Sequence, residues 1–176
     1  MSPFNYKKRF LKKQLFFHFS EDSIKMDIRR RWVVLRLSME KDIPEEALRK
    51  FYEKKRIGKY EGRFEALHYA VTHSDYIVTA WDGVKLVGIL RSTGDYIFSQ
   101  YINNFLIDED YNGKGIGSKM LDAYLEAVED VMDVYIITGR KITHSFTINW
   151  FKYKGFELVE IKDDLQVFKR TNTPEE

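Results

Sequence analysis

The stretch that most constrains the fold runs from Asn103 to Lys119 and reads NNFLIDEDYNGKGIGSK. Its apolar run FLI at residues 105–107 predicts a strand, which runs into an acidic turn and then into three alternating glycines, Gly113, Gly115 and Gly117. A helix is expected next, because apolar residues follow at helical spacing. These residues are Ile116, Met120, Leu121, Leu125 and Val128.

A strand, a glycine loop and a helix start in this order predict an anion site. The first backbone N–H groups of a helix have no intrahelical partner, and the helix dipole favours negative charge beside them. Glycines lack the Cβ atoms that would hold a phosphate away from those groups, and Lys114 and Lys119 add positive charge. We interpret the loop as a pyrophosphate cradle. A plain turn before a helix is the alternative, because glycine-rich turns are common.

The glycine spacing excludes two other phosphate-binding loops. A P-loop needs GxxxxGK followed by Ser or Thr, and this run does not occur in the sequence. A dinucleotide-binding loop needs GxGxxG, with an acidic residue closing the following strand. Here the glycines read GxGxG, and the next predicted strand, Met132 to Thr138, ends without that acid.

The run NGKGIG at residues 112–117, with the strand before it, resembles the acyl-CoA-binding motif of the GNAT (Gcn5-related N-acetyltransferase) superfamily. The family pattern is Gln/Arg-x-x-Gly-x-Gly/Ala after a strand that splays from its neighbour, and Asn112 departs from the first position. The order of elements from roughly Trp32 to Arg170 is also similar, including the Gly155-Phe156 pair after a Tyr-rich helix. The resemblance implies an α/β fold with a mixed, mostly antiparallel central sheet, a splayed strand pair and helices on both faces.

By this resemblance, the chain is expected to be an acetyl-CoA-dependent N-acetyltransferase that acts on a primary amine of a small molecule or protein. The amine attacks the acetyl carbonyl directly in this family, so the absence of cysteine is no objection. A backbone N–H of the strand before the loop would polarise that carbonyl. The residues expected to bind acetyl-CoA are Phe105, Leu106, Ile107, Asn112, Gly113, Lys114, Gly115, Ile116, Gly117, Ser118 and Phe151.

The proton transfers are only partly assigned by the resemblance. Many members carry Glu, Asp or His on the strand before the loop, where this chain has Tyr101, Asn103 and Asn104, and none of these is a base at neutral pH. Many also place a Tyr where this chain has Phe151. Tyr153, two residues on, is the expected acid, although about 200° of helical rotation separates the two positions and packing is its alternative role. These departures favour the alternative function, a non-catalytic module of the same fold that binds or senses acyl-CoA.

Two helices are predicted around the loop from Ile57 to Arg63, the first beginning at Pro44 and the second spanning Phe64 to Thr72. The resemblance places this pair and its loop in the wall of the acceptor site. The candidate wall residues are Tyr52, Tyr60 and Phe64, for each of which core packing is the alternative. The later helix is expected from Ile142 to Tyr153.

Strand patterns account for most of the remaining chain. Asp82-Gly83 between two apolar runs predicts a hairpin with a type I′ turn. The expected strands are Trp32 to Leu37, Tyr76 to Trp81, Val84 to Arg91, Tyr96 to Ile107, Met132 to Thr138, Phe156 to Glu160 and Leu165 to Arg170.

One domain is expected at residues 31–170, because 176 residues with 44% hydrophobic content can bury one core. A disordered tail is expected at 171–176 and an extension at 1–30. In the extension, Ile24 to Ile28 alternates like a half-buried strand and could pair with Gln14 to Phe19. A basic helix over Tyr6 to Phe17 is the alternative. Such an added element could also extend a sheet across a homodimer.

Composition argues against several classes of partner. The net charge of +2 does not call for nucleic acid. There is no apolar run near the ~20 residues needed to cross a bilayer, so no membrane partner is expected. The five-residue spacing of His68 and His73 does not suit one helical face, and no metal is expected. We expect a cytoplasmic protein.

Overall fold

The computed structural model describes residues 23–28, 31–55, 57, 60–139 and 145–172. Eight strands form one sheet in the order β1-β2-β3-β4-β5-β6-β8-β7. The strands are β1 (Ser23–Ile28), β2 (Arg31–Ser38), β3 (Tyr76–Asp82), β4 (Lys85–Gly94), β5 (Ser99–Ile107), β6 (Asp133–Gly139), β7 (Glu157–Lys162) and β8 (Leu165–Thr171). All neighbouring strands are antiparallel except β5 and β6, which are parallel. The mixed, mostly antiparallel sheet is therefore confirmed.

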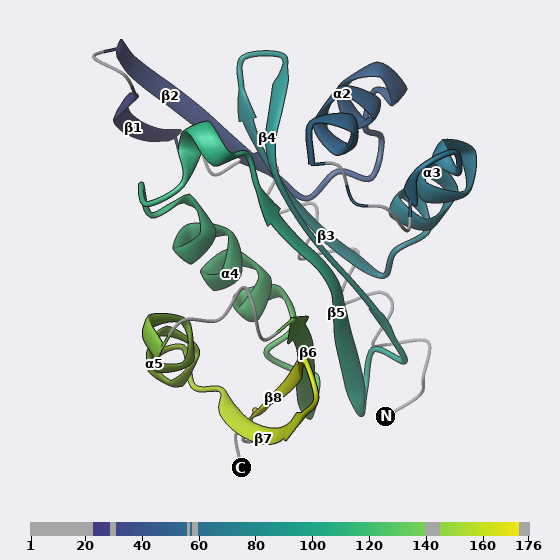
Figure 1. The fold of residues 1–176 in the computed structure, drawn as a ribbon, viewed down its shortest axis with the longest axis vertical. Helices are drawn as coiled ribbons and strands as arrows, with labels where there is room; N and C mark the ends of the chain where they lie inside the picture. Colours follow the sequence, from purple (N-terminus) through teal and green to yellow (C-terminus); the bar gives the residue numbers. More distant parts are fainter. Residues whose placement is uncertain (1–22, 29–30, 56, 58–59, 140–144, 173–176) are drawn as a thin grey trace.

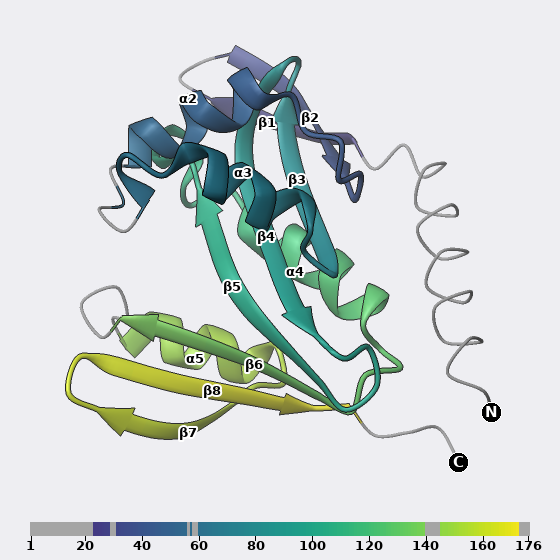
Figure 2. The same ribbon diagram turned by 90° about the vertical axis from the view of Figure 1, so that its right-hand side faces the viewer.

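Helices cover both faces of the sheet (Figures 1 and 2). On one face lie α2 (Glu45–Lys55) and α3 (Phe64–Thr72), and on the other lie α4 (Ile116–Ala127) and α5 (Ser145–Tyr153). The short 3-10 helix η2 (Glu109–Tyr111) joins β5 to the glycine loop. Each pair of helices closes its own hydrophobic core against the sheet. Within the described ranges, none of these helices has the length and apolarity of a membrane span.

The helix after the glycine loop forms as its pattern predicts. The apolar face of α4 is buried, with Met120, Leu121 and Tyr124 inaccessible to solvent. These side chains pack against β3 and β4 in the larger of the two cores. Because this face holds α4 against the sheet, the glycine loop that precedes it is carried by a rigid element.

The sheet opens between β5 and β6. The two strands pair over only four residues each, from Ser99 to Ile102 on β5 and from Asp133 to Ile136 on β6. Beyond Ile102, β5 continues to Ile107 in contact with β4 alone among the described strands. Figure 2 shows the two strands diverging toward the end where the glycine loop begins. The splayed pair is therefore confirmed.

The hairpin between β3 and β4 has a different turn from the one expected. Asp82 pairs with Lys85, so the two central residues are Gly83 and Val84. Of these only Gly83 has a positive φ, at 58°. A positive φ at the first central residue alone is the signature of a type II′ turn, and the type I′ prediction is wrong.

The strand that leads to the glycine loop begins at Ser99, three residues later than expected. The carboxylate of Asp95 accepts hydrogen bonds from the backbone N–H groups of Ile97, Phe98 and Ser99, at 2.7–3.0 Å. Tyr96 has a positive φ of 66°, which a strand does not allow. Asp95 thus holds the chain in a turn, which outweighs the apolar pattern from Tyr96 to Phe98.

The two ends of the described chain also differ from expectation. Ile24 to Ile28 does form a strand, but β1 pairs with β2 and belongs to the main sheet. The expected partner at residues 14–19 and the alternative helix at 6–17 lie outside the described residues. At the other end, Thr171 completes β8 and Asn172 is buried, donating to the carbonyls of Val128 and Val131 at 3.0 and 2.6 Å. The tail prediction is wrong for these two residues. Residues 140–144 and 173–176 lie outside the description.

Candidate functional site

The open side of β5 presents backbone groups that no neighbouring strand among the described residues pairs with. The Asp108 N–H donates to the Val87 carbonyl of the neighbouring chain segment at 2.8 Å. Because successive residues of a strand point their backbone groups in opposite directions, Ile107 and Phe105 direct theirs away from β4. They face the gap where β5 and β6 have parted. An extended ligand can therefore hydrogen-bond to β5 as an added strand would.

The glycine loop stands at the end of this gap. Gly113 and Gly115 have φ angles of 71° and 78°, a backbone conformation that residues with a Cβ rarely adopt. Gly115 is the N-cap of α4 and has no side chain that could cap that helix end. A Cβ added at either glycine would meet nothing within 4 Å. The N–H groups that open α4 are thus approachable by an anion.

The third glycine lies beside the Phe105 ring, at an ordinary contact distance. A Cβ at Gly117 would lie 3.4 Å from the ring of Phe105. The Phe105 ring in turn stacks on Trp150 of α5, with centroids 6.1 Å apart. The start of α4, the open strand β5 and α5 therefore meet around the gap.

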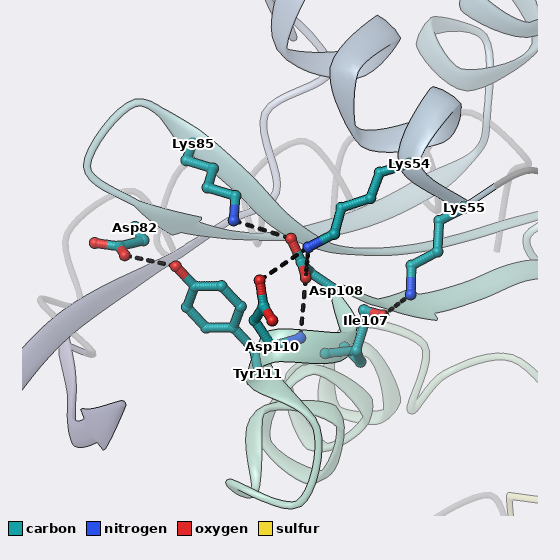
Figure 3. A network of polar contacts seen from close by, with 8 residues as sticks. All are labelled: Lys54, Lys55, Asp82, Lys85, Ile107, Asp108, Asp110 and Tyr111. Atoms are coloured by element: carbon teal, nitrogen blue, oxygen red, sulfur yellow. Dashed lines mark hydrogen bonds and ion pairs between the residues drawn. The ribbon is translucent and has the colours of Figure 1, made fainter. Parts of the chain in front are cut away.

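A cluster of charges fixes the end of β5 (Figure 3). Asp108 is only 1% exposed, and its carboxylate pairs with Lys54 of α2 at 2.5 Å and with Lys85 of β4 at 3.0 Å. It also accepts from the Asp110 N–H, and Lys54 reaches the Asp110 carboxylate at 3.0 Å. Burial acts to raise the pKa of Asp108, but the hydrogen bonds from both lysines outweigh it and lower the pKa.

Two further contacts tie this region to its neighbours. The ammonium of Lys55 donates to the Ile107 carbonyl on the open side of β5. Burial lowers the pKa of Lys55. The Tyr111 hydroxyl donates to Asp82 at 2.6 Å. The sequence analysis missed the roles of all three lysines, because they approach Asp108 and Ile107 from segments far away in the chain.

A cavity of about 740 Å³ is lined by residues of α2, of α3 and of the loop between them. All three aromatic residues suggested for the acceptor wall, Tyr52, Tyr60 and Phe64, line it. Tyr52 and Tyr60 meet edge to face, with centroids 5.3 Å apart. Tyr60 also hydrogen-bonds to Asn104 of β5, so one wall residue of the cavity contacts the strand that borders the gap.

The polar side chains of β5 where the gap opens already have interaction partners. Asn104 is buried and accepts a hydrogen bond from Arg91 Nε at 2.6 Å. Asn103 is exposed and donates to Thr93 at 2.7 Å. The Tyr101 ring stacks on Tyr135 of β6, with centroids 5.1 Å apart. None of the three offers a basic group at this position.

The two α5 residues singled out from the sequence point in different directions. Phe151 is 3% exposed and packs between Phe156 and Phe168 in the core. Tyr153 is 82% exposed, and its ring lies 5.7 Å from the ammonium of Lys154. The remaining candidates, Leu106, Asn112, Lys114, Ile116 and Ser118, follow the strand, the loop and the helix start, with the Leu106 side chain directed to the α2–α3 core.

A sheet that opens between two parallel strands, beside a glycine-lined helix start, places this chain among the acetyltransferase-like α/β folds. The Acetyltransferase (GNAT) family model matches residues 37–156, and the chain belongs to this family.

One sequence relative is the GCN5-related N-acetyltransferase 2, chloroplastic, of Arabidopsis thaliana, 25% identical over 75 residues. The match covers 42% of this chain and only 27% of the Arabidopsis protein.

Solved structures share the fold over most of their length. PH1933 from Pyrococcus horikoshii aligns with a TM-score of 0.65 and 18% identity, over 79% of this chain and 99% of its own. An aminoglycoside 6'-N-acetyltransferase in complex with coenzyme A gives 0.65 and 13%, over 80% and 99%. The ribosomal-protein-S18-alanine N-acetyltransferase of Escherichia coli gives 0.65 and 12%, over 81% and 96%. At these identities the likeness establishes the fold.

Proposed function

We propose that the protein is an acetyl-CoA-dependent N-acetyltransferase that acts on a primary amine of a small molecule or protein. The observation that carries the proposal is the continuity of the open side of β5 with the glycine-lined start of α4. A ligand that has amide groups at one end and phosphates at the other matches this surface. Membership of the family and a structural neighbour in complex with coenzyme A support the same assignment.

Each part of the surface has a distinct role in this proposal. The backbone groups of Phe105 and Ile107 would hold the pantetheine arm, and a backbone N–H of the same strand would polarise the thioester carbonyl. Asn112, Lys114 and Ser118 would surround the phosphates with the three loop glycines and Ile116. Phe151 supports this region from within the core, because it is buried.

The reaction itself needs no acyl-enzyme. The acceptor nitrogen attacks the carbonyl carbon of the thioester, so that a C–N bond forms and the C–S bond breaks. One proton leaves the nitrogen and the departing thiolate gains one, which gives an N-acetyl amine and free CoA. Since Tyr153 is largely exposed and Asn104 is engaged by Arg91, we assign the proton transfers to water.

Calorimetric titration with acetyl-CoA and with CoA tests the cradle. We expect micromolar binding, and we expect Gly115→Glu to abolish it by placing a side chain and a negative charge at the start of α4. Gly83→Glu is the matched control, since Gly83 also has a positive φ and open space but lies in the β3–β4 turn. Equal affinity of the Gly115→Glu variant and the wild type would refute this placement of the site.

A non-catalytic acyl-CoA-binding module is the second candidate function. The observation that favours it is the engagement of Asn104, at a position where many family members carry an acidic group or a histidine. Release of the CoA thiol in the presence of a polyamine, an arylalkylamine and a lysine peptide separates the two functions. Binding of acetyl-CoA without turnover of any acceptor would support the module.

A further inference from the structure

The last residue of α2 reaches the open side of β5 (Figure 3). Lys55 ends α2, and its ammonium donates a hydrogen bond to the Ile107 carbonyl. That carbonyl shares a trans peptide unit with the Asp108 N–H, so the two groups point in opposite directions. Because the Asp108 N–H points to Val87, the Ile107 carbonyl points away from β4. Lys55 therefore lies at the gap that is proposed to hold the arm of acetyl-CoA.

The two lysines that end α2 have different surroundings. Lys54 pairs with the carboxylates of Asp108 and Asp110 at 2.5 and 3.0 Å. Among the described residues, Lys55 has no carboxylate within ion-pair distance, and the acceptor of its hydrogen bond is a neutral carbonyl. Burial is the largest influence on the pKa of Lys55 and lowers it, whereas the charges of Glu109 and Asp108 act to raise it. Lys55 is thus a half-buried cation with few acceptors of its own.

The ammonium of Lys55 can donate more hydrogen bonds than the protein accepts from it. A lysine ammonium carries three N–H groups. Within the part of the chain that the structure describes, its one hydrogen bond is the bond to Ile107. Partly desolvated donors without acceptors are costly. Since Lys55 is only half-buried, a ligand that lies in the gap can still accept from it.

The chemistry of the ligand decides which of its parts can use these donors. A ligand that pairs with Ile107 as an added strand presents amide N–H groups and amide carbonyl oxygens along its length. Of these, the carbonyl oxygens can accept from an ammonium. The pantetheine arm of acetyl-CoA carries such amides, whereas its nucleotide end carries the phosphates that are proposed to lie at the start of α4. Lys55 is therefore matched to the arm of the ligand.

We propose that Lys55 is a positioning residue for the pantetheine arm. It keeps its hydrogen bond to the Ile107 carbonyl and donates a second one to an amide carbonyl oxygen of the arm. The inference rests on the proposed acetyl-CoA site and adds to it a side chain from α2, on a segment distant in the sequence from β5 and the glycine loop. The arm is then held both by the backbone of β5 and by this side chain.

Calorimetry with two ligands separates a contact to the arm from a contact to the phosphates. CoA is compared with adenosine 3'-phosphate 5'-diphosphate, which keeps the nucleotide and the phosphates but lacks the arm. We expect Lys55→Met to weaken the binding of CoA about tenfold, because a hydrogen bond from a charged donor is lost. The nucleotide should lose less than about twofold, since solvent and salt screen a distant charge. Equal weakening of both ligands, or unchanged affinity for CoA, would overturn the proposal.

Lys50→Met is the matched control variant. The Lys50 side chain lies on the same helix, is 73% exposed and pairs with Glu46, so this variant removes the same charge from α2 without touching β5. We expect the affinity for both ligands to stay within about twofold of the wild type. Methionine keeps the apolar stem of a lysine, and melting temperatures will show that both variants fold. An equal loss of CoA affinity in the two variants would refute a specific contact from Lys55.

Chemical labelling of the wild type gives a second readout that needs no variant. Reductive methylation modifies accessible lysine amines, and mass spectrometry of the peptides reports each site. We expect CoA to slow the labelling of Lys55 severalfold and the nucleotide without the arm to leave it unchanged. Lys50 should react equally in all three conditions. Labelling of Lys55 at the same rate with and without CoA would contradict the proposal.

The outcome can be separated from that of the proposed function. Failure of the wild type to bind CoA and acetyl-CoA would refute both proposals. Binding of CoA by the wild type that neither Lys55→Met nor the labelling of Lys55 reflects would refute this inference alone. The proposed acetyl-CoA site would then stand without a contact from α2.

Discussion

At the scale of single residues, Asp108 joins three segments that are distant in the sequence. Its carboxylate meets Lys54 from α2 and Lys85 from β4, and it caps η2 through the Asp110 N–H. These contacts hold the last residue of β5 and the first turn of the loop in place. The position of the glycine loop is therefore fixed by this ion cluster as well as by α4.

Asp108→Asn should test this role. It keeps the shape of the side chain but removes the charge, and we expect the free energy of unfolding to fall by about 1–3 kcal/mol. The lower end is favoured, because both lysines are close to half exposed and solvent screens them. Urea denaturation at pH 7 measures the loss, and Asp164→Asn in the exposed β7–β8 turn is the control. Equal losses in the two variants would contradict the assignment.

The same carboxylate predicts a pH dependence. The pKa of Asp108 is lower in the folded protein than in the unfolded chain. Its contribution to stability is therefore fully present above the unfolded value, about 3.9, and is lost as the pH falls through the folded value. The stability difference between wild type and Asp108→Asn should shrink below pH 4, which denaturation curves from pH 7 to pH 3 would show. A difference that stays constant over this range would argue against the lowered pKa.

Tyr153→Phe addresses the acid expected from the resemblance. Because the Tyr153 ring is 82% exposed, we expect turnover to change less than about twofold, well short of the 10²–10⁴-fold typical of a catalytic acid. Steady-state kcat with a confirmed acceptor is the measurement. A hundredfold loss of kcat with unchanged KM for acetyl-CoA would restore Tyr153 as the acid.

Residue-level features differed in how well the sequence predicted them. The need for glycine at 113 and 115 follows from local spacing, and both have positive φ. The pairing of Lys54 with Asp108 and the burial of Arg91 beside Asn104 depend on how the helices pack on the sheet. No local pattern encodes such contacts, so sequence reasoning could not find them.

At the scale of elements, the turn between β4 and β5 has little freedom. A Cβ at Gly94 would lie 2.0 Å from the Ser99 carbonyl oxygen, which belongs to the backbone. Gly94→Ala must therefore displace the start of β5, and we expect a loss of at least about 2 kcal/mol in the free energy of unfolding, in the range of severe overpacking.

Gly88→Ala is a suitable comparison for this variant. Its nearest contact would be the flexible end of Met120, at 2.7 Å, which can move aside. The loss should be smaller than for Gly94→Ala when both are measured by urea denaturation. The reverse order would mean that the turn adapts more easily than the core.

Helices were predicted more accurately than strand ends. The pattern for α3 gave its bounds, Phe64 to Thr72, because an amphipathic helix carries its signal over several turns. The start of β5 was wrong because one side chain, Asp95, binds three N–H groups of a segment with an apolar pattern. The type of the β3–β4 turn depends on strand register, which includes an irregularity between Ala80 and Trp81.

At the scale of the whole molecule, the sheet consists of two parts joined by a short parallel pairing. Within the sheet, the two parts contact each other through the four residue pairs between β5 and β6. One hydrophobic core contains residues from both parts. A ligand that binds along the open side of β5 should slow amide hydrogen exchange at Phe105, Ile107 and the loop from Gly113 to Gly117. Hydrogen-exchange mass spectrometry with and without CoA tests this expectation. Slower exchange confined to α2 and α3 would place the ligand on the wrong face.

The order of elements and the fold class were predictable from the sequence, because the glycine motif lies in a recognisable succession of strands and helices. The position of β1 was not, since strand pairing joins it to β2 across two residues that no turn motif marks. The cavity at the α2–α3 loop also arises only when α2, the loop and α3 come together in space.

The opening between β5 and β6 gives this sheet a third edge. Beside its two outer margins, β1 and β7, the sheet has an inner margin along Phe105 and Ile107. Outer margins must be protected from pairing with other chains, but the inner one lies between two strands of the same sheet (Figure 2). This inner margin can stay open without promoting aggregation, and a ligand no wider than one strand can pair with it. The fold thus leaves one side of β5 without a neighbouring strand beyond Ile102, and a thin, amide-bearing chain fits that position.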